Sequence, residues 1–171
     1  MKLAQNQKLI YRVACVVTNG DKILLHRGEM DSFYALPGGS VEFGETSIEA
    51  LHREMKEELG ASVQPGQLLW VVENFFEYME KQCHEIGLYY QMKFCGDSLK
   101  FNQSNEFEGL EAHFIKDKSF KLYFKWFEAD EIKNADIRPS FLKEALLNLP
   151  EQTQVVINRP LHMDRTTEAQ L

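Results

Sequence analysis

The chain has 171 residues, of which 44% are hydrophobic and 12% aromatic, which is enough apolar material for one well-formed core. Its formal net charge of -7 argues against a stable nucleic-acid complex or binding to an anionic membrane, because both partners are themselves negatively charged. No apolar run approaches the length of a membrane span, and the N-terminal segment lacks the apolar run of a signal peptide, so we expect a cytoplasmic protein.

Two strands joined by a tight turn are predicted near the start of the chain. Residues 10–18 are rich in Val and Ile, and the turn sequence NGD follows at 19–21. The return strand is expected over residues 22–25. Arg12 and Arg27 lie near the strand ends, where each is either a surface charge or, because a guanidinium matches phosphate geometry, a substrate-binding group. We favour Arg27, because it leads toward the next loop.

A glycine turn and a helix follow. The sequence PGG at 37–39 predicts a turn, because glycine adopts backbone angles that other residues avoid. Thr46 and Glu49 have the spacing of a capping box, in which a hydroxyl and a carboxylate accept hydrogen bonds from free amides at a helix start. Gly60 is placed as the stop, so we expect a helix over residues 46–59.

The predicted helix has two distinct sides, because successive residues advance by about 100°. Its apolar stripe, expected to pack on the core, contains Ile48, Leu51, Met55 and Leu59. Its acidic arc contains Glu54, Glu57 and Glu58. Carboxylates at these spacings repel one another by roughly 0.2–0.5 kcal/mol per pair on an exposed helix. In a partly buried setting, at a separation near 6 Å, the repulsion approaches ~3 kcal/mol per pair.

Two interpretations of the acidic arc stay open on the helix alone. It is either a solvated acidic surface, as in many Glu-rich helices, or a site for a divalent cation whose charge removes the repulsion. Oxygen-only ligands suit hard cations such as Mg²⁺ and Mn²⁺. The spacing of the whole segment shifts the balance toward the cation.

The segment from Gly39 to Ala61 resembles the Nudix box, G-x5-E-x7-R-E-U-x-E-E-x-G-U, where U is a bulky aliphatic residue. Every fixed Gly, Glu and Arg of this pattern is present at its spacing: Gly39, Glu45, Arg53, Glu54, Glu57, Glu58 and Gly60. The departure is Ala61, where the family prefers a larger residue, and this affects packing rather than chemistry. The resemblance extends over roughly residues 8–149, but only the box is highly specific.

The resemblance implies roles for the residues of the box. The implied ligands of Mg²⁺, or of Mn²⁺ in its place, are Glu54, Glu57, Glu58 and the carbonyl of Gly39. Glu45 and Arg53 would form an ion pair that fixes the loop against the helix and orients Glu54. The implied reaction is the attack of water on the diphosphate of a nucleoside diphosphate linked to another group. One carboxylate would take the proton from that water, and which one stays open.

Other side chains could complete such a site. The resemblance suggests a further carboxylate after the box helix, as a metal ligand or a base, and the candidates are Glu106, Glu108 and Glu111, with solvated surface as the alternative. Tyr34, just before the glycine turn, is expected either to pack beneath the loop or to stack on a nucleobase.

The rest of the chain predicts a mixed sheet. Strands are expected over residues 68–76, 84–94, 121–127 and 155–157. The connections are expected to be a loop at 78–82, a polar segment at 96–105, a turn at 128–132 and a helix at 141–149 capped by Ser140. With helices on its faces, such a sheet forms an α/β/α sandwich of the α/β class, the same fold that the resemblance implies.

We expect a single Nudix hydrolase domain over residues 1–159, followed by a polar tail at 160–171. The expected partner is a small nucleotide-containing diphosphate. We favour a nucleoside triphosphate, an oxidised one included, because the chain reads as a single compact domain, and ADP-ribose or another nucleotide sugar is the alternative. The oligomeric state, a homodimer included, stays open.

Two rival functions of the acidic helix remain to be weighed. One is a non-catalytic Nudix-like module that senses a nucleotide, but such modules usually lose box carboxylates, and this chain keeps them all. The other is a purely structural metal site, whose removal would unfold the protein. Catalysis is the favoured interpretation.

Overall fold

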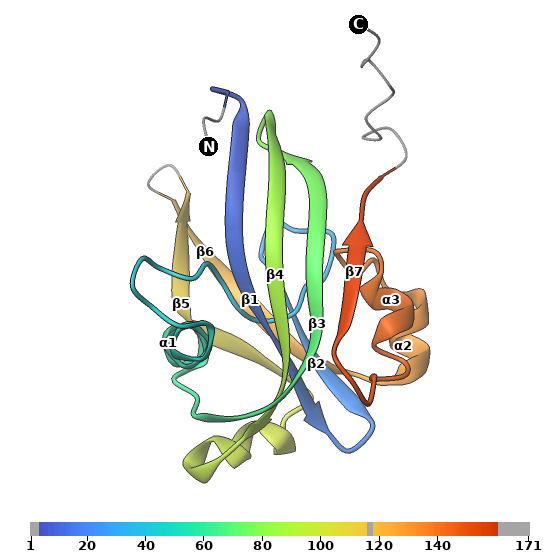
Figure 1. Ribbon diagram of the computed structural model, residues 1–171. Helices are drawn as coiled ribbons and strands as arrows, with labels where there is room; N and C mark the ends of the chain where they lie inside the picture. The colour runs from blue at the N-terminus through green and yellow to red at the C-terminus, as the bar shows by residue number, and fades with distance from the viewer. Residues whose placement is uncertain (1–3, 116–117, 161–171) are drawn as a thin grey trace, which may run out of the picture.

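The computed structural model describes residues 4–115 and 118–160. Within that part of the chain, seven strands form one sheet in the order β5-β6-β2-β1-β4-β3-β7 (Figure 1). The strands are β1 (Gln7–Asn19), β2 (Lys22–Gly28), β3 (Val63–Tyr78), β4 (Lys81–Phe94), β5 (Glu106–Ile115), β6 (Lys118–Phe127) and β7 (Gln154–Asn158). The helices are α1 (Ser47–Leu59), α2 (Ala129–Asn134) and α3 (Leu142–Ala145), with a 3-10 helix over Gly96–Gln103.

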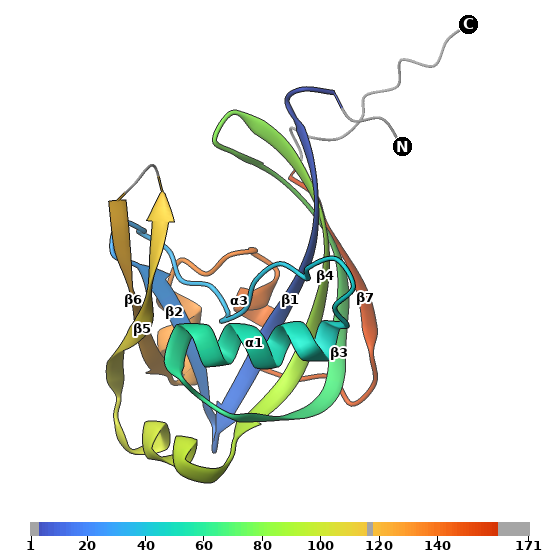
Figure 2. The ribbon, with the colours of Figure 1, turned by 90° about the vertical axis from the view of Figure 1, so that its left-hand side faces the viewer.

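The sheet divides into two halves that meet at the first hairpin. One half is mixed: β1 pairs parallel with β4, β4 antiparallel with β3, and β3 parallel with β7. The other half is antiparallel and consists of β2, β6 and β5. β1 pairs with β2 beside their turn, at Thr18 with Ile23 and Asn19 with Lys22. Figure 2 shows the halves diverging above this hairpin, with α1 lying across the space between them.

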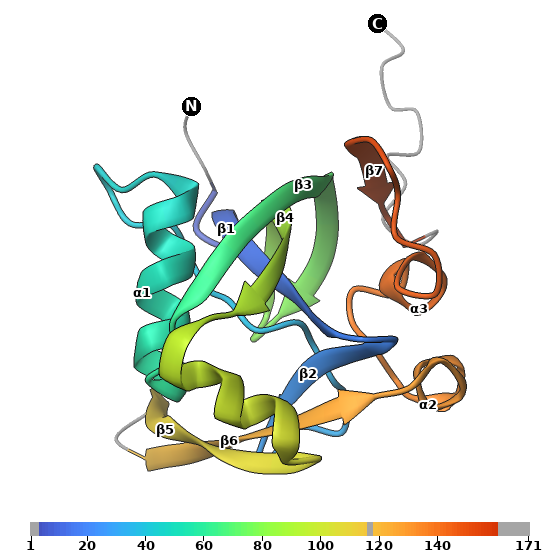
Figure 3. The same cartoon turned by 90° about the horizontal axis from the view of Figure 1, so that it is seen from below.

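β1 supplies both hydrophobic cores, because successive side chains of a strand point to opposite faces. Val13, Cys15 and Val17 pack in a cluster with the apolar stripe of α1. Ala14 and Val16 pack in a second cluster, which includes buried residues of α2, α3 and the segments around them. Figure 3 shows α1 on one side of the strands and α2 and α3 on the other. The predicted α/β/α sandwich with a mixed sheet is therefore confirmed.

The helix of the box begins and ends as predicted. The Thr46 hydroxyl accepts a hydrogen bond from the backbone N–H of Glu49 at 3.3 Å, and the Glu49 carboxylate accepts one from the N–H of Thr46 at 2.8 Å. Gly60 has the left-handed φ of 64° and ends the helix. Leu51, Met55 and Leu59 are buried, while Ile48 is partly buried at the rim of the cluster.

Several connections differ from the sequence prediction. The loop expected at 78–82 is shorter, because β3 and β4 continue to a two-residue turn at Met79 and Glu80, with φ of 48° and 62°. The turn expected at 128–132 is largely the helix α2, and the polar segment at 96–105 contains the 3-10 helix.

The last predicted helix is also wrong in its extent. Instead of residues 141–149, α3 covers Leu142–Ala145, and it begins without a side-chain cap. The Ser140 hydroxyl instead donates to Asn158 Oδ1 at 3.2 Å, so this serine ties the segment to β7. Burial of Leu142 and Leu146 holds the short helix in place, which shows that tertiary packing overrides the local pattern.

The polar tail predicted at 160–171 lies outside the described residues except for Pro160. In the part of the chain that the structure covers, no helix combines the length and apolar character needed to cross a membrane.

The glycine turn supplies a test of the fold. A methyl group at Gly38, whose φ is 137°, would overlap the carbonyl oxygen of Val13, whereas Gly44, with φ of 85°, has open space around it. We expect Gly44→Ala to lower the free energy of unfolding by about 1–2 kcal/mol for the backbone conformation alone. Gly38→Ala should cost about 1–3 kcal/mol more, because β1 or the loop must also move. Urea denaturation of both variants measures the difference, and equal losses would contradict the close packing.

Candidate active site

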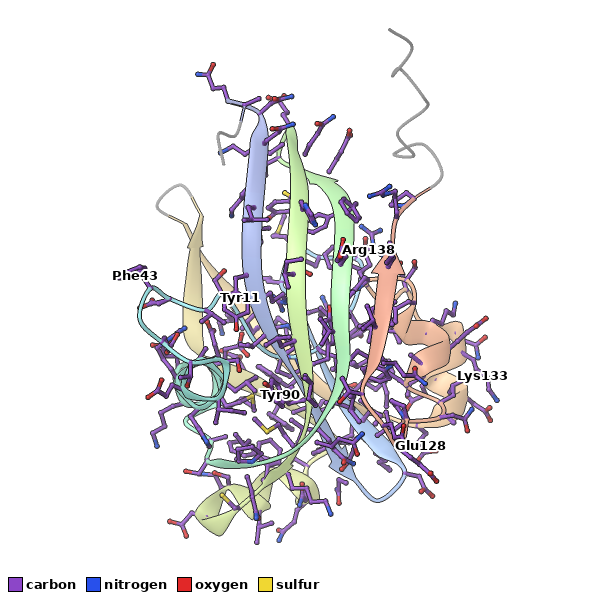
Figure 4. The ribbon with its side chains drawn as sticks, in the orientation of Figure 1. Tyr11, Phe43, Tyr90, Glu128, Lys133 and Arg138 are labelled. Carbon is purple, nitrogen blue, oxygen red and sulfur yellow. The ribbon has the colours of Figure 1, made fainter. Side chains whose placement is uncertain are left out.

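The loop before α1 is held against the free edge of β1. The backbone N–H of Val13 donates to the carbonyl of Gly39 at 2.9 Å, and the N–H of Cys15 donates to the carbonyl of Pro37 at 2.8 Å. The loop then swings outward, and its tip carries the exposed Phe43 (Figure 4). These hydrogen bonds fix the position of the Gly39 carbonyl, whose second lone pair remains available to another ligand.

Arg53 connects the loop to the helix. Its Nε and Nη2 donate to the two carboxylate oxygens of Glu45, each at 2.9 Å, in a bidentate pair. Nη2 also donates to the carbonyl of Ser40 at 2.9 Å. Nη1 donates to Glu54 at 2.9 Å and to Glu57 at 3.1 Å. One guanidinium therefore contacts three of the four box carboxylates, and the pairing with Glu45 that the sequence suggested is present.

The pKa values in this cluster shift for different reasons. The hydrogen bonds from Arg53, and then the backbone N–H of Glu42, lower the pKa of Glu45. Burial raises the pKa of Glu54, and the hydrogen bond and charge of Arg53 oppose that shift. The carboxylates in turn raise the pKa of Arg53, so the guanidinium stays charged.

The acidic arc of α1 is not a solvated surface. Glu58 is only 1% exposed and Glu54 8% exposed, whereas the Glu57 side chain is 44% exposed. Glu58 faces β2, with its Oε1 at 4.0 Å from His26 Nδ1. Two of the three carboxylates are thus turned inward, toward the loop and β2, and the third stays accessible from solvent.

The oxygen donors of the box are of the kind that a hard divalent cation prefers. Glu45, Glu54 and Glu57 contact one guanidinium, so negative charge is in excess around it, and the burial of Glu54 makes that excess costly. The Glu54 carboxylate lies so close to Gly39 that a Cβ there would overlap it, which brings that carboxylate to the loop. No three His, Cys, Asp or Glu side chains of the described residues surround a single point. Arg53 Nη1 instead lies between Glu54 and Glu57.

The two predicted substrate-binding residues lie together, but away from the box. Arg27 and Tyr34 both line a cavity of about 280 Å³. Tyr34 packs edge-on against Phe127 at 4.7 Å between ring centroids, as core packing beneath the loop would require. His26 approaches Glu58, so its neighbour Arg27 points to the opposite face of β2. The structure therefore does not bring Arg27 and Tyr34 to the box carboxylates.

Two of the further carboxylates expected after the box helix also lie at the cavity that Arg27 lines. Glu106 and Glu108 line the cavity with Arg27, and they form ion pairs with Lys125 at 3.5 Å and with Lys121 at 2.8 Å. Their surroundings thus fit the surface interpretation better than metal ligation. The side chain of Glu111 lies outside the described residues.

Arg12, which the sequence ranked below Arg27, and His26 are neighbours of the site on β1 and β2. Arg12 bridges to Ser40 of the loop, and its Nη2 donates to the carbonyl of Leu36 at 3.4 Å. Burial raises the pKa of Glu54, and the charge of Arg12 is among the contributions that oppose this shift. The alternation along β1 and β2 was the available signal, but it could not show which face of each strand meets the loop.

A mixed sheet between helices, with a capped acidic helix joined by an arginine to a glycine loop, defines the class of Nudix-type pyrophosphohydrolases. The chain belongs to the NUDIX family, because the model of the NUDIX domain matches residues 8–145.

Similar proteins agree with this assignment. An ADP-ribose pyrophosphatase from Methanocaldococcus jannaschii is 31% identical over 121 residues, which cover 65% of this chain and 70% of the relative. A MutT protein from Bacillus halodurans has a similar fold, with a TM-score of 0.60, 17% identity, and coverage of 85% of this chain and 86% of that one. An ADP-ribose pyrophosphatase from Streptococcus suis 89-1591 gives a TM-score of 0.56 at 15% identity, covering 86% and 98% of the two chains.

The bidentate pair can be tested by titration. Arg53→Lys replaces a planar fork by a point charge, so the pKa of Glu45 should rise toward its ordinary 4.5. Because the pKa of Glu45 is lowered in the folded protein, the pair stabilises the fold above pH 4.5, and this contribution is lost as the pH falls through the lowered value. Carbon-13 NMR of the Glu45 carboxyl group measures the shift, and an unchanged pKa in the variant would contradict the assigned pairing.

Proposed function

We propose that the protein is a Mg²⁺-dependent hydrolase that splits the diphosphate of a nucleoside diphosphate linked to another group. The observation that carries this proposal is the burial of Glu54 and Glu58, with Glu54 held beside the Arg53 clamp and the glycine loop. A cation and a phosphate-rich substrate would supply the positive charge and the ligand that such a cluster lacks.

Each box residue then has a proposed role. The proposed ligands of Mg²⁺, for which Mn²⁺ can substitute, are Glu54, Glu57, Glu58 and the carbonyl of Gly39. Bound there, the metal would neutralise charge on phosphoryl oxygens and lower the pKa of a water. One of the carboxylates would take the proton from the attacking water. Arg53 and Glu45 position the site, because they hold the loop and the Glu54 carboxylate in fixed relation.

The substrate class has two candidates. The relative from M. jannaschii, named as an ADP-ribose pyrophosphatase, favours ADP-ribose or another nucleotide sugar. The alternative from the sequence is a nucleoside triphosphate. A nucleotide-sensing module without activity is disfavoured, because the box keeps every carboxylate and two of them, Glu54 and Glu58, are buried.

A substrate panel tests the reaction. Nucleoside triphosphates, ADP-ribose, nucleotide sugars, dinucleoside polyphosphates and NADH are each incubated with the protein and Mg²⁺, and the phosphate-containing products are identified by chromatography. We expect cleavage within a diphosphate, with activity lost on chelation and restored by Mg²⁺ or Mn²⁺. If no compound of the panel is cleaved with either Mg²⁺ or Mn²⁺, the proposal is contradicted.

Glu57→Gln separates catalysis from a structural use of the metal. Because the Glu57 side chain is half exposed, its neutralisation should leave the melting temperature nearly unchanged, while turnover falls by roughly 10²- to 10⁴-fold. Glu42→Gln, an exposed carboxylate of the preceding loop, is the matched control and should keep wild-type turnover. Unfolding of Glu57→Gln with normal activity in the remaining folded fraction would favour the structural-metal interpretation instead.

A further inference from the structure

One rung of the mixed half-sheet is polar on the face that packs toward α2 and α3. Glu85 of β4 lies opposite Asn74 of β3, and Asn74 lies opposite Asn158 of β7. We call these three residues the polar rung. Two rungs further along the same face, Tyr89 lies opposite Trp70, and both are buried in the second core. The polar rung therefore lies where the apolar packing of this face ends.

A chain of hydrogen bonds runs along the polar rung toward its carboxylate. The Ser140 hydroxyl donates to Asn158 Oδ1 at 3.2 Å, and Asn158 Nδ2 donates to Asn74 Oδ1 at 2.7 Å. Asn74 Nδ2 then donates to Glu85 Oε1 at 3.2 Å. Hydrogen bonds between described residues thus leave Glu85 Oε2 and the second N–H of Asn74 for another partner.

The carboxylate of the polar rung is costly to bury. Glu85 is 5% exposed and Asn74 6% exposed, and among the described residues no ion pair reaches Glu85. One hydrogen bond from an amide compensates only part of the cost of taking a carboxylate out of water. Such a residue is more readily explained by a ligand than by stability.

The polar rung lies next to the candidate active site. The register sets Arg12 of β1 opposite Gly87, two residues after Glu85, so Arg12 shares the face of the polar rung and also bridges to Ser40 of the box loop. Gly87 leaves space beside Glu85, into which the Tyr89 ring leans, because a Cβ there would lie 2.7 Å from that ring. The negative charge of Glu85 contributes to the raised pKa of Tyr89, after burial, and Arg12 opposes it.

Two loops border the same region. The Arg138 guanidinium lies over the Phe33 ring at 4.4 Å, and the Arg138 N–H donates to the carbonyl of Tyr34 at 2.9 Å. Figure 4 shows Arg138 beside β3 and β7, and Ser140 of the same loop joins Asn158. The Phe33 ring and the Arg138 guanidinium thus stack on each other in the loops that border this region, and both kinds of group also stack on bases.

We propose that the polar rung is the nucleobase-recognition site of this enzyme, in which Glu85 Oε2 accepts a hydrogen bond from the amino group of the base and Asn74 donates to the adjacent base atom. An acceptor beside a donor matches the edge of an amino-bearing base, which offers a donor next to an acceptor. The hydroxyls of the ribose are the other source of such donors. This inference rests on the proposed function, because it assigns the part of the same substrate that is not cleaved.

The experiment compares amino-bearing substrates with counterparts in which hydrogen replaces the amino group. The ratio of kcat/KM for ADP-ribose over its purine-riboside analogue, for ATP over purine-riboside triphosphate, and for GTP over ITP, is measured in wild-type protein and in Glu85→Gln. Gln keeps the size of Glu and an oxygen for Asn74, but it lacks the charge. We expect the preference for the amino-bearing base to fall by roughly 10- to 100-fold, as for the loss of a charged hydrogen bond.

Two further variants keep the test decisive. Glu77→Gln removes an exposed carboxylate of β3, the strand that carries Asn74, and should retain the wild-type preference. Asn158→Ala interrupts the hydrogen-bond chain without changing the carboxylate and should shift the preference in the same direction by less. Thermal unfolding confirms that each variant is folded. An unchanged preference in folded Glu85→Gln and Asn158→Ala would overturn the proposal.

Two further measurements separate failure of this inference from failure of the proposed function. Substrates with 2′-deoxyribose are included, and a loss in Glu85→Gln that follows the 2′-hydroxyl instead of the amino group would overturn recognition of the base. Dissociation constants of the same nucleotides are measured by calorimetry in the Glu57→Gln background. If no diphosphate is split but base-selective binding disappears with Glu85→Gln, the hydrolase proposal fails while the recognition site stands.

Discussion

A single guanidinium holds the loop, the helix and the carboxylates of the candidate site together. Arg53 has a bidentate pair with Glu45, a hydrogen bond to the loop carbonyl of Ser40, and contacts to Glu54 and Glu57. A lysine has the same charge but not this planar fork, so the geometry depends on arginine itself. The three carboxylates that contact Arg53 carry more charge than its one guanidinium, which agrees with the divalent cation proposed for this site.

The box carboxylates and the polar rung lie on opposite faces of the sheet beside β1. The odd-numbered residues of β1 pack against the apolar stripe of α1, beside which Glu54 and Glu58 are buried, while Arg12 and the other even-numbered residues face the region of the polar rung. The loop that carries Gly39 is hydrogen-bonded to the edge of this same strand. Arg12 bridges to Ser40 of that loop and shares the face of Glu85, so it lies between the two sites.

The sequence predicted what depends on local spacing, but it could not place side chains whose position depends on strand register. The cap at Thr46, the stop at Gly60 and the apolar stripe of α1 follow from periods within one helix. Arg27 was favoured over Arg12 because it leads toward the loop, but alternation along β2 turns it away from Glu58. Long-range strand pairing decides which face of a strand meets a distant loop. A shift of one residue in the pairing register turns every side chain of the strand to the other face. The short α3 was overestimated for a related reason, because packing of Leu142 decides its extent.

Two carboxylates of this fold, Glu58 and Glu85, are buried at positions where an acidic side chain does not help to stabilise the protein. Glu58 is almost fully buried on α1, beside an apolar cluster that a leucine would extend at lower cost, because buried ionic groups rarely repay their desolvation. Glu85 of β4 is also buried, and it lies at the end of the apolar cluster that contains Trp70 and Tyr89. Neither residue improves the packing of its cluster. Since the helix cap and the apolar stripe already stabilise α1, and the strand pairing already stabilises β4, the acidic identity at these two positions is best explained by the ligands that each carboxylate can bind.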